Sequence, residues 1–274
     1  MKASLSFLTI LFLSSCAAGK ERAYTASTPA DPIVRQFLGI SLTDSVDFIR
    51  WNFTFNDLNY KLQCNYGVGK PNTNGFYDEG KKIELTGKVK SEGNYYSLFN
   101  GTRTLRLVEF NNDLLHLVYN DNKMLKGNGG WSYVLNNINA TVSNSFNLTA
   151  QQTALKDSMS YEGRTPCGIP RIVAPGAECY KLKWLIIFYA DSKKNEPTTY
   201  RILGTPWRKE GGRTGTWKII KEKDNRIRYL LLDEKGNILL TILKVDENVI
   251  LFTDANGNLL VGDHNFSYTL NRRF

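Results

Sequence analysis

The feature that most constrains the fold is a short sequence that occurs twice, at residues 124–136 and again at residues 259–271. Each copy starts with two apolar residues, one variable residue and a glycine, and after three further residues it ends in aromatic-Ser-Tyr-x-Leu-Asn. The offset is a constant 135 residues, from Gly127 to Gly262 and from Asn136 to Asn271. A gapless match of this length indicates that the chain is a tandem duplication of one domain.

The duplication extends upstream of this motif if small gaps are allowed. Matched segments of the two halves share a tryptophan, a tyrosine and a glycine at corresponding positions: residues 50–55 with 183–188, 59–62 with 199–202, and 86–87 with 214–215. Each half has roughly eight short apolar runs separated by tight turns, at the spacing of about 8–12 residues that is typical of all-β domains. Neither half has a strong helical period.

An antiparallel meander of about eight strands fits a small closed barrel, in which no sheet edge is left exposed. We therefore predict an all-β protein of two tandem antiparallel meander β-barrels that are lipocalin-like, with a β-sandwich as the alternative. The repeated motif should supply the strand that closes each barrel against the first strand of its own domain. Its Ser and Asn side chains are expected to bond the backbone at this closing seam.

The N-terminus has the pattern of a bacterial lipoprotein signal. Lys2 precedes an apolar run at residues 5–13, which is too short to span a bilayer, and Cys16 follows two serines and precedes Ala17. This resembles the lipobox, in which the cysteine is acylated after cleavage, and several acyl chains on one residue give stable anchoring. An ordinary cleaved secretory signal is the alternative. Ala17 is not the aspartate of an inner-membrane retention signal, which favours the outer membrane.

Composition along the chain divides it into five predicted segments. Residues 17–31 are small, polar and aperiodic, as in a flexible tether, and residues 138–158 break the strand rhythm, as in a linker that could contain a short helix at 149–155. The segments are a signal peptide with the lipobox cysteine (1–16), a tether (17–31), a first barrel (32–137), a linker (138–158) and a second barrel (159–274).

The four cysteines suggest one disulfide. If Cys16 carries lipid, Cys167 and Cys179 are the natural pair in an oxidising periplasm, because they bracket a loop rich in glycine and proline. Closing a loop of about a dozen residues contributes roughly 3 kcal/mol. Cys64 lies within an apolar run and is expected to be a buried free thiol.

No catalytic, metal or cofactor motif is evident. The two histidines, His116 and His264, occupy non-equivalent positions of the repeat, and neither has partners at metal-ligand spacing. Residues 254–258 resemble the start of a calcium loop, but the glycine falls at the fourth position and not the sixth, and no glutamate occupies the twelfth, so a hairpin turn is favoured. The net charge of +9 is spread along the chain without a basic run, which argues against nucleic acid as a partner.

Four aromatic residues of the second half are the remaining candidates for a ligand site: Trp184, Phe188, Trp207 and Trp217. The interior of a barrel of about eight strands is just wide enough either to be filled by side chains or to hold one small ligand. The pattern is therefore compatible with a ligand cavity and with a packed core.

A family resemblance rests on the lipobox and on the segment Tyr161-x-Gly163-x-x-Pro166-Cys167. Together they resemble the NlpE-like lipoproteins, envelope proteins with a lipocalin-like barrel that are associated with copper tolerance and envelope-stress sensing. The family's motif continues as Cys-x-x-Cys, whereas residues 167–170 read Cys-Gly-Ile-Pro, so the resemblance does not imply a metal site here. The whole chain looks like a two-barrel lipoprotein of Bacteroidetes type.

These features lead to one functional hypothesis. We expect a non-catalytic protein that is lipid-anchored in the bacterial outer membrane, facing the periplasm or the cell surface, and that binds a small hydrophobic or amphipathic ligand or an envelope protein. The alternative is a structural or interaction lipoprotein with filled barrels that takes part in envelope-stress sensing.

Overall fold

The computed structural model describes residues 21–141, 143, 145–150, 153–173, 178–222 and 224–273. The predicted signal peptide and Cys16 lie outside these residues.

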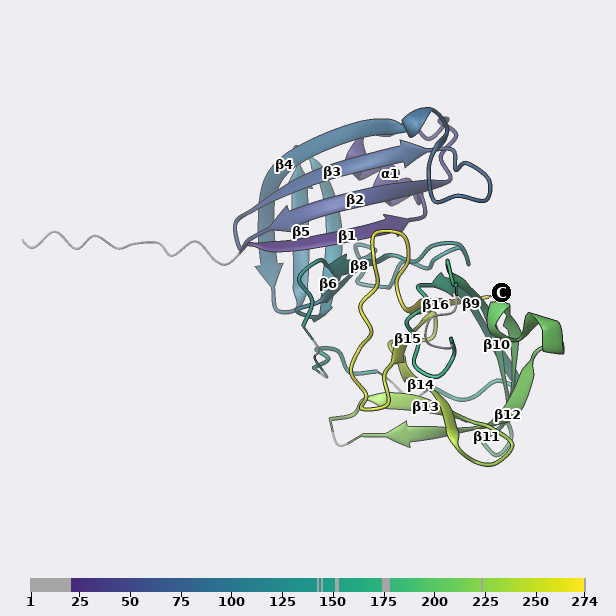
Figure 1. Cartoon of the computed structure of the whole chain (residues 1–274). Coiled ribbons are helices and arrows are strands. Elements are labelled where there is room, and N and C mark those ends of the chain that lie inside the picture. Colours follow the sequence, from purple (N-terminus) through teal and green to yellow (C-terminus); the bar gives the residue numbers. More distant parts are fainter. Residues whose placement is uncertain are drawn as a thin grey trace, which may run out of the picture.

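The chain folds into two closed antiparallel barrels, each of eight strands in meander order (Figure 1). The predicted pair of tandem all-β barrels is confirmed, and the β-sandwich alternative is wrong. The first barrel consists of β1 (Arg22–Thr28), β2 (Phe48–Phe55), β3 (Asn59–Gly67), β4 (Lys81–Glu92), β5 (Tyr95–Asn100), β6 (Arg103–Asn111), β7 (Leu114–Val118) and β8 (Val134–Asn137). The second consists of β9 (Ser158–Thr165), β10 (Leu182–Asp191), β11 (Glu196–Gly204), β12 (Arg213–Lys221), β13 (Ile227–Leu232), β14 (Ile238–Lys244), β15 (Val249–Thr253) and β16 (Thr269–Arg272).

Strand β1 corrects the predicted tether and the predicted start of the first barrel. Residues 22–28 are a full barrel strand that pairs with β2 on one side and β8 on the other. The sequence did not predict this strand because it is rich in hydroxyl side chains. In the structure these polar side chains are buried and hydrogen-bonded. Thr25 donates to the carbonyl of Trp51, and Ser27 donates to the carbonyl of His264. A polar strand is stable in a barrel when each buried hydroxyl finds an acceptor.

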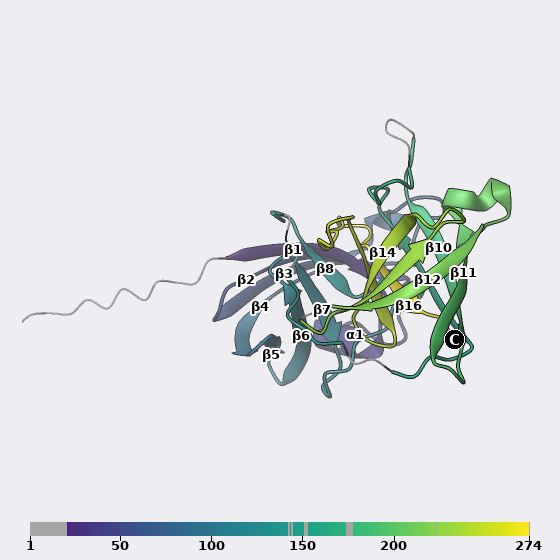
Figure 2. The ribbon, with the colours of Figure 1, turned by 90° about the horizontal axis from the view of Figure 1, so that it is seen from below.

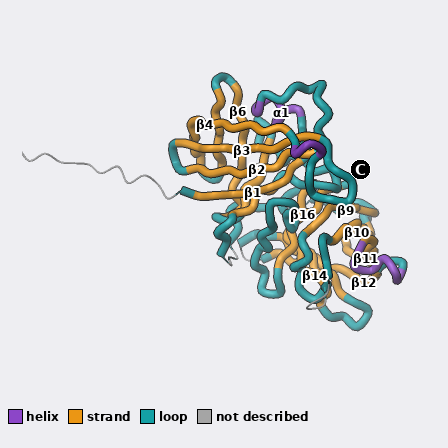
Figure 3. The backbone as a smooth tube through the Cα atoms, turned by 45° about the horizontal axis from the view of Figure 1, so that its top comes forward, coloured by secondary structure: helices purple, strands orange, loops and turns teal. Residues whose placement is uncertain are grey.

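One end of each barrel is closed by the connection between its first two strands. In the first barrel this connection contains the helix α1 (Pro32–Leu38), which Asp31 caps at its start and Gly39, with a φ of 78°, ends in the left-handed region. The helix buries Val34, Phe37 and Leu38 against the barrel core. Its seven residues are too few to show a period, so the sequence did not predict it. The other helical segments, η1 (Tyr77–Glu79) and η2 (Thr205–Glu210), are shorter still (Figure 3).

The second barrel closes the same end with a disulfide loop. Cys167 and Cys179 are bonded, as predicted, and the loop they bracket buries Ile169 against the barrel core. The two copies of the domain therefore close the same end by different means.

The upstream part of the duplication is confirmed by matching side-chain bonds in the two barrels. The indole of Trp51 donates to Thr28 Oγ1 and the indole of Trp184 donates to Thr165 Oγ1, each at 2.9 Å. Both acceptors lie at the end of the first strand of their barrel. The tryptophan therefore ties the start of the second strand to the end of the first in both copies.

A second matching bond explains the shared glycine. The hydroxyls of Tyr60 and Tyr200 donate to backbone carbonyls of β5 and β13, each at 3.1 Å. A Cβ on Gly87 would lie 2.6 Å from the Tyr60 ring, and a Cβ on Gly215 would lie 2.7 Å from the Tyr200 hydroxyl. Each glycine therefore leaves room for a tyrosine that reaches across the strand.

The repeated motif both closes the barrels and joins them. Strands β8 and β16 pair with the first strand of their own barrel, although in the first barrel that strand is β1, which the sequence assigns to the tether. Their polar residues, however, reach across to the other copy. Ser132 Oγ lies 2.6 Å from Ser267 Oγ. The expectation that the motif's Ser and Asn bond the backbone at the closing seam is therefore corrected in part. Ser132 does accept from Val134 N of its own motif at 3.3 Å, but Ser132 and the two asparagines also bond groups of the other barrel.

The two motif asparagines form a reciprocal pair of bonds. Gly262 N donates to Asn136 Oδ1 and Gly127 N donates to Asn271 Oδ1, both at 2.9 Å. A Cβ on Gly127 would lie 2.6 Å from the Asn271 amide. The glycine and the asparagine of the motif are thus spaced to recognise each other in the opposite copy, as in an isologous dimer interface.

An apolar layer surrounds these polar bonds and packs the barrels side by side (Figure 2). Three pairs of its buried members come from matching positions of the two copies: Val108 and Leu243, Phe110 and Val245, and Leu114 and Val249. Val118 and Val134 from the first barrel and Leu251 and Leu259 from the second complete the layer. These residues point outward from their own barrel. The inter-barrel contact is therefore a hydrophobic core of its own.

We expect Asn136→Ala to reduce the free energy of unfolding by roughly 1–3 kcal/mol, because two partly buried backbone groups lose their partner. These groups are Gly262 N and the carbonyl of Asp263, to which Asn136 Nδ2 donates at 3.1 Å. Urea unfolding followed by tryptophan fluorescence measures the change. Exposed Asn139→Ala is the matched control, and an equal effect in the two variants would contradict the assignment.

His116 lies in this apolar interface at the repeat position of Leu251. It is fully buried, its Nδ1 lies 2.6 Å from the carbonyl of Leu117, and its Nε2 has no hydrogen-bond partner within the described part of the chain. Burial lowers the pKa of His116 to about 4, and the bond with Leu117 only partly counteracts it. The fold therefore stabilises the neutral ring.

This lowered pKa predicts acid sensitivity. Stability is full above the ordinary histidine pKa of 6.5 and is lost as the pH falls from 6.5 towards 4, because the unfolded chain binds the proton first. Between about pH 7.5 and about pH 5, the wild type should lose about 2 kcal/mol more than His116→Leu, which carries the residue of the other repeat. Urea unfolding at the two pH values measures this difference. Replacement of exposed His264 by Gln should leave the wild-type loss intact.

Candidate functional site

The end of each barrel opposite the closing connection is its mouth, and the two mouths differ. The second barrel has a cavity of about 310 Å³ there. Its lining includes Leu155 from the connection between the barrels, Met159 and Tyr161 from β9, Tyr229 from β13, Lys244 from β14 and Arg272 from β16. The lining residues therefore come from β9 and β16, the two strands that meet where the barrel closes, from β13 and β14, and from the connection between the barrels.

The floor of the cavity is aromatic, and the rest of its lining includes four cations, Lys156, Lys244, Arg272 and Arg273, and one acid, Glu247. Tyr161 and Tyr229 are buried, and the hydroxyl of Tyr161 donates to the carbonyl of Glu247 at 3.0 Å. The guanidinium of Arg272 lies 5.3 Å from the centre of the Tyr161 ring, and its Nη1 is 3.5 Å from the Tyr161 hydroxyl. This contact holds Arg272 at the rim by a cation–π interaction.

Lys244 is the unusual residue of the wall. It is only 3% exposed, and its ammonium donates to Thr153 Oγ1 at 3.1 Å. Burial lowers the pKa of Lys244, and the negative charges of Glu247 and Asp246 oppose this shift. A lysine ammonium that is taken from water in this way gains from any anion that enters the cavity.

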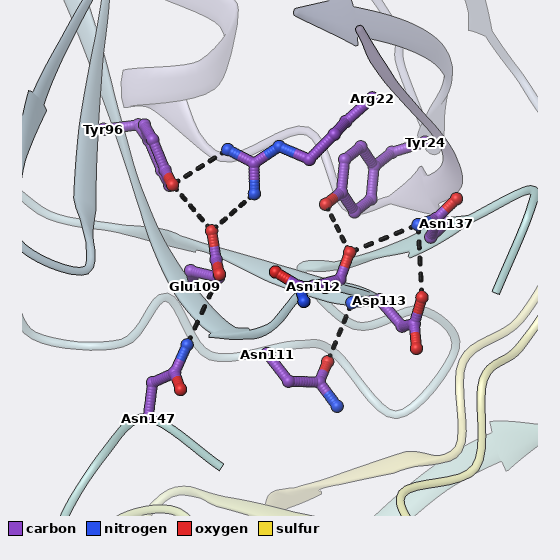
Figure 4. A network of polar contacts seen from close by, with 9 residues as sticks. All are labelled: Arg22, Tyr24, Tyr96, Glu109, Asn111, Asn112, Asp113, Asn137 and Asn147. Atoms are coloured by element: carbon purple, nitrogen blue, oxygen red, sulfur yellow. Dashed lines mark hydrogen bonds and ion pairs between the residues drawn. The ribbon is translucent and has the colours of Figure 1, made fainter. Parts of the chain in front are cut away.

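The first barrel has an ion pair at the same place (Figure 4). Arg22 binds Glu109 at 2.7 Å and donates to the hydroxyl of Tyr96 at 2.8 Å, while Tyr96 donates to Glu109 at 2.6 Å. Hydrogen bonds with Tyr96 and Glu109 outweigh burial and raise the pKa of Arg22. The mouth of the first barrel is therefore filled by side chains that satisfy one another.

The strand pairing shows which positions correspond. Tyr24 lies opposite Asn137 at the seam of the first barrel, as Tyr161 lies opposite Arg272 in the second. The corresponding pairs at the two mouths are Arg22 and Met159, Tyr24 and Tyr161, Tyr96 and Tyr229, Glu109 and Lys244, and Asn137 and Arg272. The tyrosines are shared, whereas the acid of the first mouth has become a base in the second.

The shared pair Tyr24 and Tyr161 serves the fold, because the two residues make the same bond in both copies. Tyr24 donates to the carbonyl of Asn112 at 2.7 Å, as Tyr161 does to that of Glu247. Lys244 and Arg272 have no such counterpart. Since the first barrel closes without a cation at either position, these two residues are candidates for a role other than folding.

The aromatic residues that the sequence singled out lie elsewhere. Trp184, Phe188 and Trp217 are buried in the core of the second barrel, where Phe188 and Trp217 pack edge to face at 4.9 Å. Trp207, on η2, packs edge to face against Trp184 at 6.3 Å. None of the four lines the cavity at the mouth. Trp184, Phe188 and Trp217 fill the barrel interior and the partly buried Trp207 packs against it, so the cavity at the mouth lies above Tyr161 and Tyr229.

Two other residues that the sequence singled out, Cys64 and His264, do not line the cavity. Cys64 is a buried free thiol of the first barrel core, as predicted, and burial raises its pKa, which disfavours the reactive thiolate. His264 is exposed. Within the described ranges, no group of three or more His, Cys, Asp or Glu side chains is placed to hold a metal ion.

Sequence reasoning missed Lys244 and Arg272, although a signal for them was present. At the constant offset of the repeat, Lys244 matches Glu109 and Arg272 matches Asn137. A search for positions where the two copies differ in charge would have found both residues. It could not have shown that Lys244 is buried.

A scan against protein-family models found no match, and searches of the curated proteins and of the solved structures found no significant match to this chain. The resemblance to NlpE-like lipoproteins therefore stays a prediction. In the part of the chain that the structure describes, none of the helices has the length and apolar character needed to cross a membrane.

Proposed function

We propose that this protein is a non-catalytic binder of a small anionic amphiphile, which it holds at the mouth of the second barrel. The observation that carries the proposal is the buried ammonium of Lys244 in the wall of a cavity, at a position where the first barrel has its own ion pair.

The chemistry of the wall favours an acidic headgroup. A carboxylate or phosphate beside Lys244 would form a charge-assisted hydrogen bond, and Arg272 at the rim could supply a second donor. Leu155, Met159 and Tyr229 offer apolar surface for a short hydrocarbon chain. The volume of about 310 Å³ is at the small end of the range for ligand pockets, which favours a compact ligand.

The second candidate function is that of a structural or interaction lipoprotein with filled barrels. The packed aromatic interiors of both barrels favour it, because neither leaves a deep lipocalin-like chamber among the described residues. The two candidates differ in what Lys244 is for. A buried charge that serves only structure should stabilise the fold, whereas one that serves a ligand costs stability in the free protein.

We expect Lys244→Met to leave the free energy of unfolding unchanged or to raise it, and to weaken the binding of octanoate at least about tenfold, the loss typical of a charged hydrogen bond. Isothermal titration calorimetry with octanoate, octanol and octylamine measures the headgroup preference. Octanoate should bind best and octylamine worst, because the wall is cationic.

Exposed Lys218→Met on β12 is the matched control and should bind octanoate like the wild type. Equal binding of octanoate and octanol would contradict the cationic site. Loss of stability in Lys244→Met, together with no binding of any of the three compounds, would favour the structural alternative.

We further propose that lipid on Cys16 anchors the protein to the bacterial outer membrane, facing the periplasm or the cell surface. Support comes from the short apolar run and the cysteine that follows it, and from the resemblance to NlpE-like lipoproteins, which associates such proteins with envelope-stress sensing. An envelope partner is compatible with this location.

Cells that express the protein should incorporate labelled palmitate into it, and Cys16→Ala should abolish the label, because the acyl chains are attached at that residue. Autoradiography of the immunoprecipitated protein measures the incorporation. Cys64→Ala should retain the label. An unlabelled wild-type protein, released in soluble form, would favour an ordinary cleaved signal peptide.

A further inference from the structure

A second cleft lies between the barrels, near the ends opposite their mouths. It has a volume of about 390 Å³ and is lined by both copies of the domain. Phe48 and Trp131 come from the first barrel, and Arg164, Tyr180 and Lys181 come from the second. No residue of this cleft lines the cavity at the second mouth.

The wall from the first barrel is a rigid aromatic stack. The ring of Phe48 lies between those of Phe76 and Trp131, with centroids 4.1 Å and 4.6 Å away and planes inclined by 16° in both cases. The guanidinium of Arg164 lies 5.5 Å from the Trp131 ring. Ser132, next to Trp131, is fixed by its bond to Ser267, so the cross-barrel contact holds this wall in place.

The wall from the second barrel is basic. Arg164, Lys181 and Lys183 line the cleft together with Lys70 on the opposite side, and none of the four forms an ion pair with a described residue. Burial lowers the pKa of Lys181, and the charges of Arg164 and Lys183 lower it further. The carboxylate of Asp47 accepts a hydrogen bond from Gly69 N at 2.7 Å.

The first barrel shows that the fold does not need this charge. Ser27 pairs with Arg50 between β1 and β2, as Arg164 pairs with Lys183 between β9 and β10. Ser27 thus corresponds to Arg164, and by the same register Phe48 corresponds to Lys181. The second copy therefore carries two cations, both facing the cleft, that the first copy lacks.

We propose that this cleft binds an acidic oligosaccharide, with its sulfate, phosphate or carboxylate groups on Arg164 and Lys181 and a sugar ring against an aromatic side chain. Tyr180 is 58% exposed at the cleft and offers a ring face to the apolar side of a sugar. The charge is confined to one cleft with an aromatic wall, whereas a single-stranded nucleic acid needs a basic groove that follows its backbone.

The test is calorimetric titration of the full chain with a sulfated tetrasaccharide, its desulfated form, inorganic sulfate and a short oligothymidylate. The wild type should bind the sulfated tetrasaccharide best. The double variant Arg164→Gln/Lys181→Gln should bind it at least about tenfold more weakly, because it removes two charged donors. Tyr180→Ala should weaken the sulfated tetrasaccharide but not inorganic sulfate, since sulfate has no ring to stack.

Exposed Lys218→Gln is the control for loss of charge and should bind like the wild type. Octanoate binding should persist in the double variant, so this proposal and that for the mouth can fail separately. Thermal unfolding shows whether the variants are folded. Equal binding of the two tetrasaccharides, of sulfate alone, or of oligothymidylate would overturn the proposal, as would wild-type affinity in a folded double variant.

Discussion

The structure depends on the reciprocal hydrogen bonds by which each copy of the motif recognises the other. Asn136 and Asn271 accept from glycine N–H groups across the interface, and Ser132 meets Ser267 between them. The strand that each motif forms also closes its own barrel. Closure of one barrel and docking of the other are therefore properties of the same residues. This double constraint explains why the motif is the segment in which the two copies are most similar, although we assign no catalytic or ligand-binding role to its Ser and Asn residues.

Because the two copies share one fold, a comparison of matched positions shows which residues the fold requires. Residues that make the same bond twice, such as Trp51 and Trp184 with their threonine acceptors, are required by the barrel. Residues that differ at a matched position are free of that requirement. By this criterion Lys244 and Arg164 stand out, since the first barrel has a paired glutamate and a serine there. Both changes add positive charge to a hollow, the cavity at the second mouth for Lys244 and the cleft between the barrels for Arg164, which is why we propose binding at these two places.

The sequence predicts the duplication, the two barrels and the closing strands, because these follow from periodicity and a constant offset. It does not predict β1, whose buried hydroxyls find acceptors on distant segments such as His264, nor α1, which is too short to show a period. It also cannot say whether the motif's polar groups bond within a barrel or between barrels, since both are compatible with the same spacing. The candidate site depends on the burial of one lysine, which only the packing reveals. The aromatic residues that pointed to a ligand turned out to be core.

Because β1 begins at Arg22, the tether between the proposed anchor and the first barrel is short. If lipid is attached at Cys16, only residues 17–21 separate the membrane from β1, and a fully extended chain of this length spans at most about 18 Å. Arg22, where β1 begins, lies at the mouth of the first barrel beside Glu109. The anchored protein would therefore keep the mouth of its first barrel close to the lipid surface. An open cavity there would face the headgroups, whereas the paired side chains of Arg22, Tyr96 and Glu109 already fill it. The cations on which the two proposed sites depend, Lys244, Arg164 and Lys181, belong to the barrel farther along the chain, and the first barrel contributes the aromatic wall of the cleft between the barrels.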